Sequence, residues 1–334
     1  MKLDWKALKQ PIVALSPMAD MTDSAFCRTV RVVSKEKEIE DNTIVFREMV
    51  SAEAVVRGND KTMGMTEIHA EERPLVQQIF GSEPAVMAES ARIIEAEHHP
   101  EGFDINMGCP VYKITCNFNG AALMKEPERA TQIIKQMKAA ITVPLSVKIR
   151  AGWADKHECL EFCKVVEAAG ADMITIHGRT KMQGYSGTSD WDIIRQVKER
   201  LSIPLLANGD IHTAPRIVDA LQQTKADGVL IARGALGNPW IFLQAEALLQ
   251  GKEMPIITAR ERVRVIKMHA ALHVEQYGIG GLRTFRKHIS WYLKGARNVK
   301  KFREALVRVE TMEALHGMLD AWLAQEGEEL VSTT

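Results

Sequence analysis

Residues 144–177 read PLSVKIRAGWADKHECLEFCKVVEAAGADMITIH and contain the unit that repeats along this chain. A short, mainly apolar run at Leu145–Ile149 follows a proline and predicts a strand. The stretch Lys156–Ala169 predicts a helix, and Gly170-Ala171-Asp172 predicts a turn before a second strand at Met173–His177. The helix is long enough for the crossover that joins two parallel strands. These residues therefore predict a β-α-β unit.

The same alternation is found along the first 240 residues. The predicted strands are Ile12–Leu15, Ile44–Val50, Leu75–Phe80, Phe103–Asn106, Leu145–Ile149, Met173–His177, Leu205–Ala207 and Gly228–Ile231. The predicted helices between them are Asp23–Val33, Pro84–Glu97, Pro127–Ile141, Lys156–Ala169, Asp190–Arg200 and Ala214–Gln223. These elements predict an α/β fold, a (β/α)8 TIM barrel. The alternative is a doubly wound open sheet, which usually has a glycine-rich loop after its first strand. Here that strand ends in LSPMADMTD, without GxGxxG, so the barrel is favoured.

The strand pattern stops after Trp240, and the rest of the chain predicts helices at Ala259–Tyr277, Leu282–Gly295 and Lys300–Gln325. A turn within QGKEMP, near Leu248–Pro255, marks the expected boundary. We therefore expect a barrel domain at residues 1–248 and a small all-helical domain at 249–334.

Composition excludes several classes of protein. Of the 334 residues, 46% are apolar and 26% are charged, which is typical of a folded globular protein. The chain has no apolar run of the roughly 18–20 residues that a membrane span needs, and its N-terminus lacks an apolar signal core. Five scattered cysteines form a poor disulfide framework and favour a cytoplasmic location. Cys159 and Cys163 lack the second pair that a metal site would need, so we expect no metal and interpret both as packing residues.

The net charge of zero hides an uneven distribution. Residues 283–303 contain eight Lys or Arg and no acidic residue, and seven acids with a single base follow from Glu304 onward. Six of the cations lie near one helical face if the helix continues through Gly295. A basic face is either a solvated surface or a site for phosphates. His288, Trp291 and Tyr292 lie among these cations and are interpreted as packing residues.

Chemistry in a TIM barrel takes place at the carboxyl ends of the strands. Polar or small residues follow nearly every predicted strand here, and together they predict a functional site at the barrel mouth. They are Pro17-Met18-Ala19, Glu48, Gln78, Asn106–Pro110, Lys148, Arg150, His177, Arg179, Asn208-Gly209-Asp210 and Ala232-Arg233-Gly234. The last two groups contain glycines, in ANGDI and ARGALGNPW, where barrels often bind phosphate. Both readings of these loops, as plain turns and as the site of a phosphate-bearing cofactor, stay open at this point.

Cys109 is the single residue that most specifically indicates a chemical role. It follows a strand in INMGCPVYK, between a glycine and a proline. An isolated cysteine is usually a small buried apolar residue, but a strand-end turn at a barrel mouth favours a chemical role. A thiol with a pKa of about 8.5 is mostly protonated at neutral pH, so it can donate a proton unaided. A nucleophile would need a neighbouring base, and no such base is evident in the sequence.

These motifs resemble those of the tRNA-dihydrouridine synthase family. The resemblance covers roughly residues 11–320. It is carried by SPMADMTDSAF, REMVSAEAV, QIFGSEP, DINMGCPVYKI, NGAALMKEP, SVKIRAGW, TIHGRTKMQGYSG, SDW, PLLANGDI and ARGALGNPWIF. The stretch GGLRTFRKHISWYLKG resembles the bacterial B-type branch. One departure is Cys116, where related sequences often carry a basic residue, and this leaves open the role of a second thiol in that loop.

The resemblance implies an oxidoreductase acting on CH–CH bonds, with bound FMN, NADPH as electron donor and tRNA as substrate. We expect a monomer. It implies an FMN-binding catalytic barrel and a tRNA-binding helical domain. The implied cofactor residues are Pro17, Met18, Ala19, Gln78, Lys148, His177, Asn208, Gly209, Asp210, Ala232, Arg233 and Gly234. Cys109 is implied as the catalytic acid that protonates C5 of a uracil after hydride transfer to C6. The implied substrate residues are Asn106, Arg150 and Arg179, and the basic segment adds Arg283, Arg286 and Lys287.

Two other functions are compatible with the residues. The first is an FMN-dependent dehydrogenase of the dihydroorotate or dihydropyrimidine type, acting on a free base; the basic helical segment argues against it, since a free base needs no such segment. The second is a non-catalytic RNA-binding barrel, against which the set of Cys109, Lys148 and His177 argues. The sequence does not indicate which uridine of the tRNA is reduced.

Overall fold

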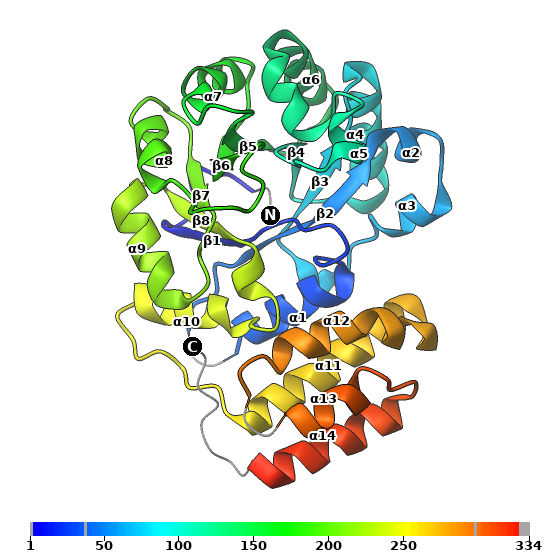
Figure 1. Ribbon diagram of the computed structural model, residues 1–334. Coiled ribbons are helices and arrows are strands. Elements are labelled where there is room, and N and C mark those ends of the chain that lie inside the picture. The colour runs from blue at the N-terminus through cyan, green and yellow to red at the C-terminus, as the bar shows by residue number, and fades with distance from the viewer. Residues whose placement is uncertain (1–2, 37–38, 297–298, 327–334) are drawn as a thin grey trace. The chain divides into compact units, whose positions relative to one another are not determined.

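The computed structural model describes residues 3–36, 39–296 and 299–326. Eight parallel strands form a closed barrel in chain order (Figure 1). They are β1 Ile12–Leu15, β2 Ile44–Ser51, β3 Leu75–Phe80, β4 Gly102–Met107, β5 Leu145–Gly152, β6 Met173–Thr180, β7 Leu205–Asn208 and β8 Gly228–Ile231. The first and last strands pair, with Ile12 opposite Gly228, and this closes the barrel. The predicted TIM barrel and its eight strands are confirmed.

By its contacts the chain divides into two compact units, which we call the barrel unit (residues 1–23 and 42–232) and the helical unit (residues 24–41 and 233–334). The first predicted helix, observed as α1 Ser24–Ser34, belongs to the helical unit because it packs against C-terminal helices. The predicted domains, 1–248 and 249–334, stay a prediction, since contacts in a folded chain do not test which part folds alone.

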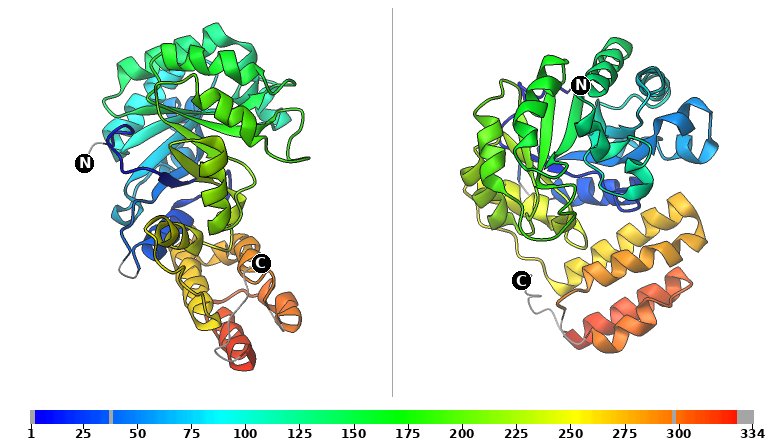
Figure 2. Two further views of the ribbon diagram at one scale, coloured as in Figure 1. Left: turned by 90° about the vertical axis from the view of Figure 1, so that its left-hand side faces the viewer. Right: turned by 45° about the horizontal axis from the view of Figure 1, so that its top comes forward.

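Helices surround the barrel (Figures 1 and 2). Their bounds in the barrel unit are α2 Ala52–Val56, α3 Asp60–Gly64, α4 Pro84–His98, α5 Tyr112–Thr115, α6 Pro127–Ala140, α7 Glu158–Ala168, α8 Trp191–Lys198 and α9 Ala214–Thr224, with 3-10 turns η1 Ala70–Glu72 and η2 Gly120–Lys125. The predicted crossover helices α4 and α6 to α9 are confirmed within two residues at each end. Their first turns carry helix-starting signals: Asp190 and Thr213 accept backbone N–H groups at the N-caps of α8 and α9.

The barrel interior changes from apolar at the amino ends of the strands to polar at the carboxyl ends. The apolar floor consists of Leu3, Trp5, Ile12, Ala14, Ile44, Phe46, Val76, Met173, Leu206 and Leu230. The ring of Trp5 stacks on that of Phe46, with centroids 6.0 Å apart. Above this floor, Gln78, Asp104 and Ser146 are register partners on β3, β4 and β5. Because partners in a parallel ladder share a face, the polar groups lie in one layer.

The helical unit contains α1 and the chain after β8. Its further helices are α10 Trp240–Leu249, α11 Ala259–Tyr277, α12 Leu282–Tyr292, α13 Lys300–Leu306 and α14 Met312–Glu326, with 3-10 turns η3 Arg233–Ala235 and η4 Ile279–Gly281. None of the described helices is long and apolar enough to cross a membrane. The prediction of one helix at Lys300–Gln325 is wrong, because a break separates α13 from α14. Thr311 begins the new helix by accepting the N–H of Ala314 at 3.2 Å.

The predicted helix Leu282–Gly295 ends earlier than expected, at Tyr292. Gly295 has a φ of +76°, a left-handed conformation that stops a right-handed helix. The basic residues of the segment therefore do not share one continuous helix. Arg297 lies outside the described residues.

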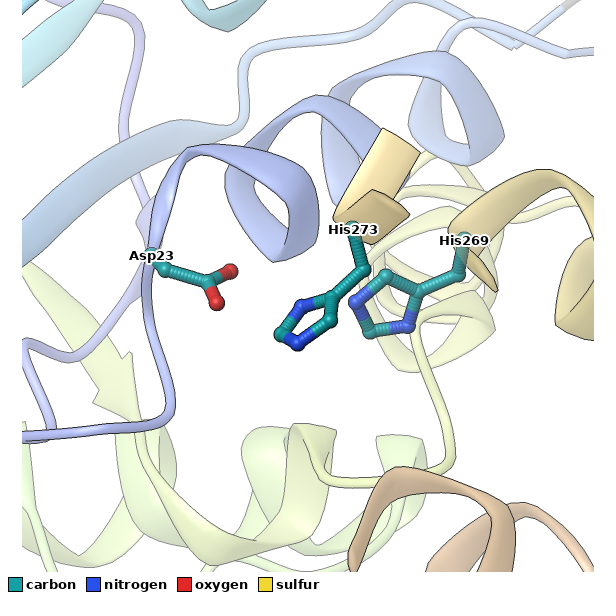
Figure 3. Close-up of side chains that lie close together, drawn as sticks. All are labelled: Asp23, His269 and His273. Carbon is teal, nitrogen blue, oxygen red and sulfur yellow. The ribbon is translucent and has the colours of Figure 1, made fainter. Parts of the chain in front are cut away.

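Aromatic and imidazole rings pack in the core of the helical unit. His269 and His273 project from successive turns of α11 (Figure 3). The His269 ring lies 4.6 Å from that of His288 and 4.9 Å from that of Phe285, centroid to centroid. Burial, together with the neighbouring His288, lowers the pKa of His269 well below its usual value, so this ring is neutral. His288 and Tyr292 are fully buried, as expected for packing residues.

Candidate active site

The turn that carries Cys109 begins where β4 ends. The side-chain oxygen of Asn106 accepts the N–H of Gly108 at 3.2 Å and that of Cys109 at 2.9 Å. The Cys109 carbonyl accepts the N–H of Ala121 at 3.1 Å, which ties the turn to η2. The cysteine is partly exposed. A thiol held by a fixed backbone and open to solvent can transfer a proton to a bound molecule.

Gly120 explains why NGAAL follows this turn. Its φ is +58°, and a Cβ there would lie 2.9 Å from the Cys109 carbonyl oxygen and 3.1 Å from the Cys109 Cβ. Any side chain would push the turn aside, so the close approach requires glycine. The second thiol, Cys116, is exposed at the end of α5.

Arg150 is buried and braces two loops. Its Nε donates to the carbonyl of Gly108 at 2.8 Å, on the Cys109 turn. Its Nη1 donates to the carbonyl of Thr180, the last residue of β6, at 3.0 Å and to that of Gly184, in the loop after β6, at 2.8 Å. The guanidinium also lies over the ring of Tyr185, 5.6 Å from its centroid. Arg150 therefore fixes the thiol turn relative to the neighbouring loop, and its predicted contact with substrate stays a prediction.

Arg179 makes a second brace of the same kind. It donates to the carbonyls of Ser186 and Gly187, and its Nη2 lies 2.8 Å from the Asp210 carboxylate. Burial by itself would raise the pKa of Asp210, but the hydrogen bonds from Arg179 and from the Ser189 N–H outweigh it and hold that pKa below its ordinary value. The pair joins the loop after β6 to the loop after β7.

The loop after β7 is shaped by close backbone approach. Gly209 has a φ of +114°, and a Cβ there would lie 2.3 Å from Ser189 Oγ and 2.7 Å from the His177 ring. Only glycine fits this position. Asn208 is buried and donates to the carbonyl of Leu230 on β8, at 2.5 Å. The predicted residues His177, Arg179, Asn208, Gly209 and Asp210 thus lie together at the ends of β6 and β7.

The ends of β3, β4 and β5 hold a second polar group. Gln78 accepts from the Asn106 amide at 2.8 Å and donates to Asp104 at 2.6 Å. Lys148 is the register partner of Asn106 on β5. Burial and the nearby Arg150 guanidinium lower the pKa of Lys148 to about 8, and Asp104 opposes them. Within the described residues, the Lys148 ammonium has no hydrogen-bond partner, so it is available to an anionic or carbonyl group of a ligand.

The loop after β1 contains Pro17, Met18 and Ala19. The N–H of Met18 donates to Thr22 Oγ1 at 2.8 Å, which folds the loop back on itself. Glu48, on β2, accepts the N–H of Asp20 at 2.6 Å. Burial raises the pKa of Glu48 to about 7; the N–H of Asp20 and the Arg47 guanidinium oppose the rise, and the Asp23 and Asp20 carboxylates add to it. Glu48 therefore holds a loop predicted to line the site.

We expect the stability of the protein to depend on pH through Glu48. Its folded pKa of about 7 lies above an unfolded value of about 4.3, so the folded state binds the proton more tightly. The contribution of Glu48 to the free energy of unfolding is largest below the unfolded pKa. It falls as the pH rises toward 7 and is constant above that. Glu48→Gln should flatten this fall and stabilise the protein at pH 8 by up to roughly 3–4 kcal/mol, because each pKa unit corresponds to about 1.4 kcal/mol. Melting temperatures at pH 5 and pH 8 measure the effect; parallel losses in variant and wild type would refute it.

The remaining predicted residues lie in the helical unit or next to it in the chain. Ala232 directly follows β8, and Arg233 and Gly234 form the first part of η3. On α12, Arg283 is exposed, whereas Arg286 and Lys287 are half-buried. Arg286 approaches the Val309 carbonyl, at 3.5 Å. Of these three cations, Arg283 is the most exposed and so the most accessible to a phosphate.

Exposed apolar side chains, which the sequence analysis missed, lie on the loops after β4 and β6. They are Val111, Tyr112, Phe118, Met182 and Tyr185. The Arg129 guanidinium lies over the Phe118 ring, 5.5 Å from its centroid. Aromatic faces accompanied by cations are typical of surfaces that bind single-stranded nucleic acid. Their signal in the sequence is aromatic residues directly after strand-end motifs.

The fold and the site define a TIM-barrel enzyme with a thiol and a ring of polar groups at the carboxyl ends of its strands. Residues 13–326 match the family model described as dihydrouridine synthase. The chain is 36% identical to tRNA-dihydrouridine synthase B of Pasteurella multocida over 329 residues, covering 96% of this chain and 97% of the relative. It is 37% identical to tRNA-dihydrouridine synthase B of Pseudomonas syringae pv. tomato, covering 90% and 88%. A probable tRNA-dihydrouridine synthase of Mycobacterium tuberculosis is 36% identical, covering 94% and 82%. The chain belongs to the dihydrouridine synthase family, an assignment that its motifs predicted.

Proposed function

We propose that this protein is an FMN-dependent tRNA-dihydrouridine synthase that uses NADPH to reduce the C5–C6 bond of specific uridines in tRNA. The observation that carries the proposal is the Cys109 turn. Its thiol is partly exposed and its backbone is held by Asn106, at the mouth of a barrel whose family is named for this reaction. A proton donor fixed at a barrel mouth is what reduction of a polarised double bond requires.

The donor set at the mouth suits FMN. Gln78, Lys148, His177 and Asn208 offer an amide, an ammonium, an imidazole and a second amide at the ends of neighbouring strands. The Lys148 ammonium has no hydrogen-bond partner among the described residues, which suits a carbonyl or anionic edge of an isoalloxazine. We propose that these groups, the loop Pro17–Ala19, and Gly209, Asp210, Ala232, Arg233 and Gly234 hold the cofactor. When bound and reduced, FMN supplies a hydride to C6 of the uracil.

The role of Cys109 is to complete the reduction at C5. Addition of hydride at C6 leaves the electron pair of the former double bond at C5, and this pair takes the proton of the Cys109 thiol. Solvent then reprotonates the thiolate. Arg150 and Arg179 act by holding the loops that border the base, since backbone carbonyls already accept most of their N–H groups. Asn106 orients the thiol and faces the substrate from the same turn.

Binding of tRNA must offset the cost of extruding a base, which is a few kcal/mol. The exposed rings of Tyr112, Phe118 and Tyr185 provide stacking faces on the barrel unit. The basic segment of the helical unit provides phosphate contacts, whose affinity falls as salt rises.

We expect Arg283→Glu to weaken tRNA binding several-fold and to reduce the salt dependence of binding, without changing flavin content or melting temperature. The reason is that Arg283 is exposed on α12. Arg260→Glu, at another exposed position of the same unit, is the matched control for charge alone. Filter binding at two salt concentrations measures the effect. Equal losses in both variants would show that only net charge is sensed.

The function itself is tested with purified protein. A yellow protein with an oxidised-flavin spectrum should consume NADPH and form dihydrouridine in tRNA from cells that lack the gene. It should act poorly on free uracil and dihydroorotate. Turnover of a free base but not of tRNA would support the free-base dehydrogenase, and a colourless protein that cannot be reconstituted with FMN would support the non-catalytic RNA-binding barrel.

A further inference from the structure

We infer that Asp104, inside the barrel and two residues before Asn106, is a positioning residue that orients the turn carrying Cys109. The sequence motifs give this residue no role in the reaction. The inference rests on the proposed function of Cys109 as proton donor. It is carried by a continuous path of hydrogen bonds within the barrel unit.

The path starts at a fully buried carboxylate. Asp104 Oδ1 accepts the hydroxyl of Ser146 at 2.6 Å, and Oδ2 accepts the amide Nε2 of Gln78 at 2.6 Å. Both partners are register neighbours of Asp104 on the adjacent strands. Strand geometry therefore holds the two donors at the carboxylate. Each carboxylate oxygen accepts a hydrogen bond from one of them.

The path continues to the thiol turn. Gln78 Oε1 accepts the Asn106 amide Nδ2 at 2.8 Å, and Asn106 Oδ1 accepts the backbone N–H groups of Gly108 and Cys109. Two side-chain amides thus stand between the carboxylate of Asp104 and the backbone of Cys109. Each amide can rotate by half a turn and exchange its oxygen and nitrogen at little cost in shape.

The two ends of the path decide how both amides point. Backbone N–H groups can only donate, so Asn106 must present its oxygen to the Cys109 turn. Its nitrogen then faces Gln78, which must accept through Oε1 and donate through Nε2. An ionised carboxylate at position 104 accepts only, so it stabilises this orientation and excludes the reversed one. Without it, a buried donor would face another donor, which is costly.

A second observation favours a role for the negative charge. Lys148 neighbours Asn106 in register, and burial and Arg150 lower the pKa of this lysine while Asp104 opposes them. Burial raises the pKa of Asp104 itself to about 6, against the hydrogen bonds from Ser146 and Gln78 and the charge of Lys148. A pKa of about 6 leaves the carboxylate mostly ionised at neutral pH.

The test is Asp104→Asn. An asparagine has nearly the same shape but can turn its nitrogen toward Gln78. In that orientation Gln78 and Asn106 reverse, and the Asn106 nitrogen faces the Cys109 N–H. The original path survives only where the asparagine nitrogen turns to Ser146 instead, whose hydroxyl then accepts it and donates to the Phe103 carbonyl at 3.2 Å. The charge that selects one orientation is lost in either case. We expect kcat for tRNA reduction to fall roughly 10- to 100-fold, the range for groups that orient a functional side chain. KM for tRNA should not change, because exposed surfaces are untouched.

Rescue separates orientation from simple loss of structure. In Asp104→Asn combined with Gln78→Glu, the carboxylate moves one position along the path and again accepts from Asn106. Because Gln78 also belongs to the proposed cofactor site, kcat is taken per bound flavin and Gln78→Glu alone is measured as a reference. We expect the double variant to exceed both single variants in kcat per bound flavin. The control Asp227→Asn alters another acid of the same barrel, which pairs with Lys198 at 2.6 Å; it should lower the melting temperature and leave kcat per bound flavin unchanged.

A second readout does not depend on turnover. In a Cys116→Ala background, the rate of Cys109 alkylation by iodoacetamide should change in Asp104→Asn and return toward the parent rate in the double variant. An unchanged alkylation rate and kcat in Asp104→Asn, or no recovery in the double variant, would overturn the inference. If the parent enzyme reduces no tRNA uridine, the proposed function fails, while alkylation still tests the coupling between Asp104 and the turn.

Discussion

Cys109→Ala is expected to leave flavin bound and to slow uridine reduction by about 10²- to 10⁴-fold, the usual contribution of a general acid. The side chain is partly exposed at the barrel mouth, while its backbone carries the hydrogen bonds of the turn, to Asn106 and from Ala121. Alanine keeps these backbone bonds, so the loss should be confined to proton transfer. The measurement is single-turnover reduction of tRNA by the prereduced enzyme.

Cys116→Ala is the matched control, because Cys116 is the other exposed thiol of the same loop. Its Sγ approaches the Lys113 carbonyl, at 3.6 Å, and is not part of the Asn106 turn. We expect wild-type rates from this variant. A wild-type rate in Cys109→Ala would refute the acid assignment, and a large loss in Cys116→Ala alone would transfer the role to the second thiol.

Most of the barrel could be predicted because it depends on local pattern. Each strand is a short apolar run between turn signals, and each long crossover helix has its own start and stop residues. The short helices α2, α3 and α5 could not be predicted, because four or five residues carry no periodicity. The break between α13 and α14 was also missed. Thr311 is a signal for a helix start, but the residues on both sides of it follow one long helical pattern.

The sequence predicted which residues form the site better than it predicted which contacts they make with one another. Strand-end positions identified Cys109, Lys148 and Asp210 as neighbours of the mouth, since all strands of a parallel barrel end on one side. The sequence could not show that Arg150 and Arg179 donate their N–H groups to loop carbonyls, because those carbonyls lie in loops of irregular conformation. It also missed Asp104, although an acid inside the apolar run FDIN is the signal that could have found it.

The two braces explain how an exposed site keeps its shape. The loops after β4 and β6 leave several of their apolar side chains exposed, so packing alone does not account for their order. Arg150 joins the first two loops, and Arg179 joins the second to the third through Asp210. A guanidinium has five donors in a rigid plane, and lysine could not make the same set of bonds.

Glu72→Ala is expected to cost about 3–5 kcal/mol of unfolding free energy, the range for breaking a buried ion pair from one side. Glu72 pairs with Arg47, and both are buried, at 0% and 1% exposure. Arg47 also donates to the carbonyls of Met65 and Glu67, at 3.1 and 3.2 Å. The guanidinium thus fastens to β2 the segment that leads from α3 into β3. Alanine would leave a buried cation without its carboxylate.

The size of this loss depends on burial, so an exposed pair of the same chemistry is the sharpest control. Glu53, on α2, and Arg57, which caps the C-terminus of that helix, form such a pair in the same unit, with side chains 49% and 77% exposed. Glu53→Ala should cost at most about 0.5 kcal/mol, since water screens an exposed pair. Replacing both buried partners, in Arg47→Met with Glu72→Leu, should recover much of the stability lost by Glu72→Ala, because no uncompensated charge remains. Urea unfolding followed by tryptophan fluorescence measures all three; equal losses at Glu72 and Glu53 would mean that the Arg47 pair is not shielded from water.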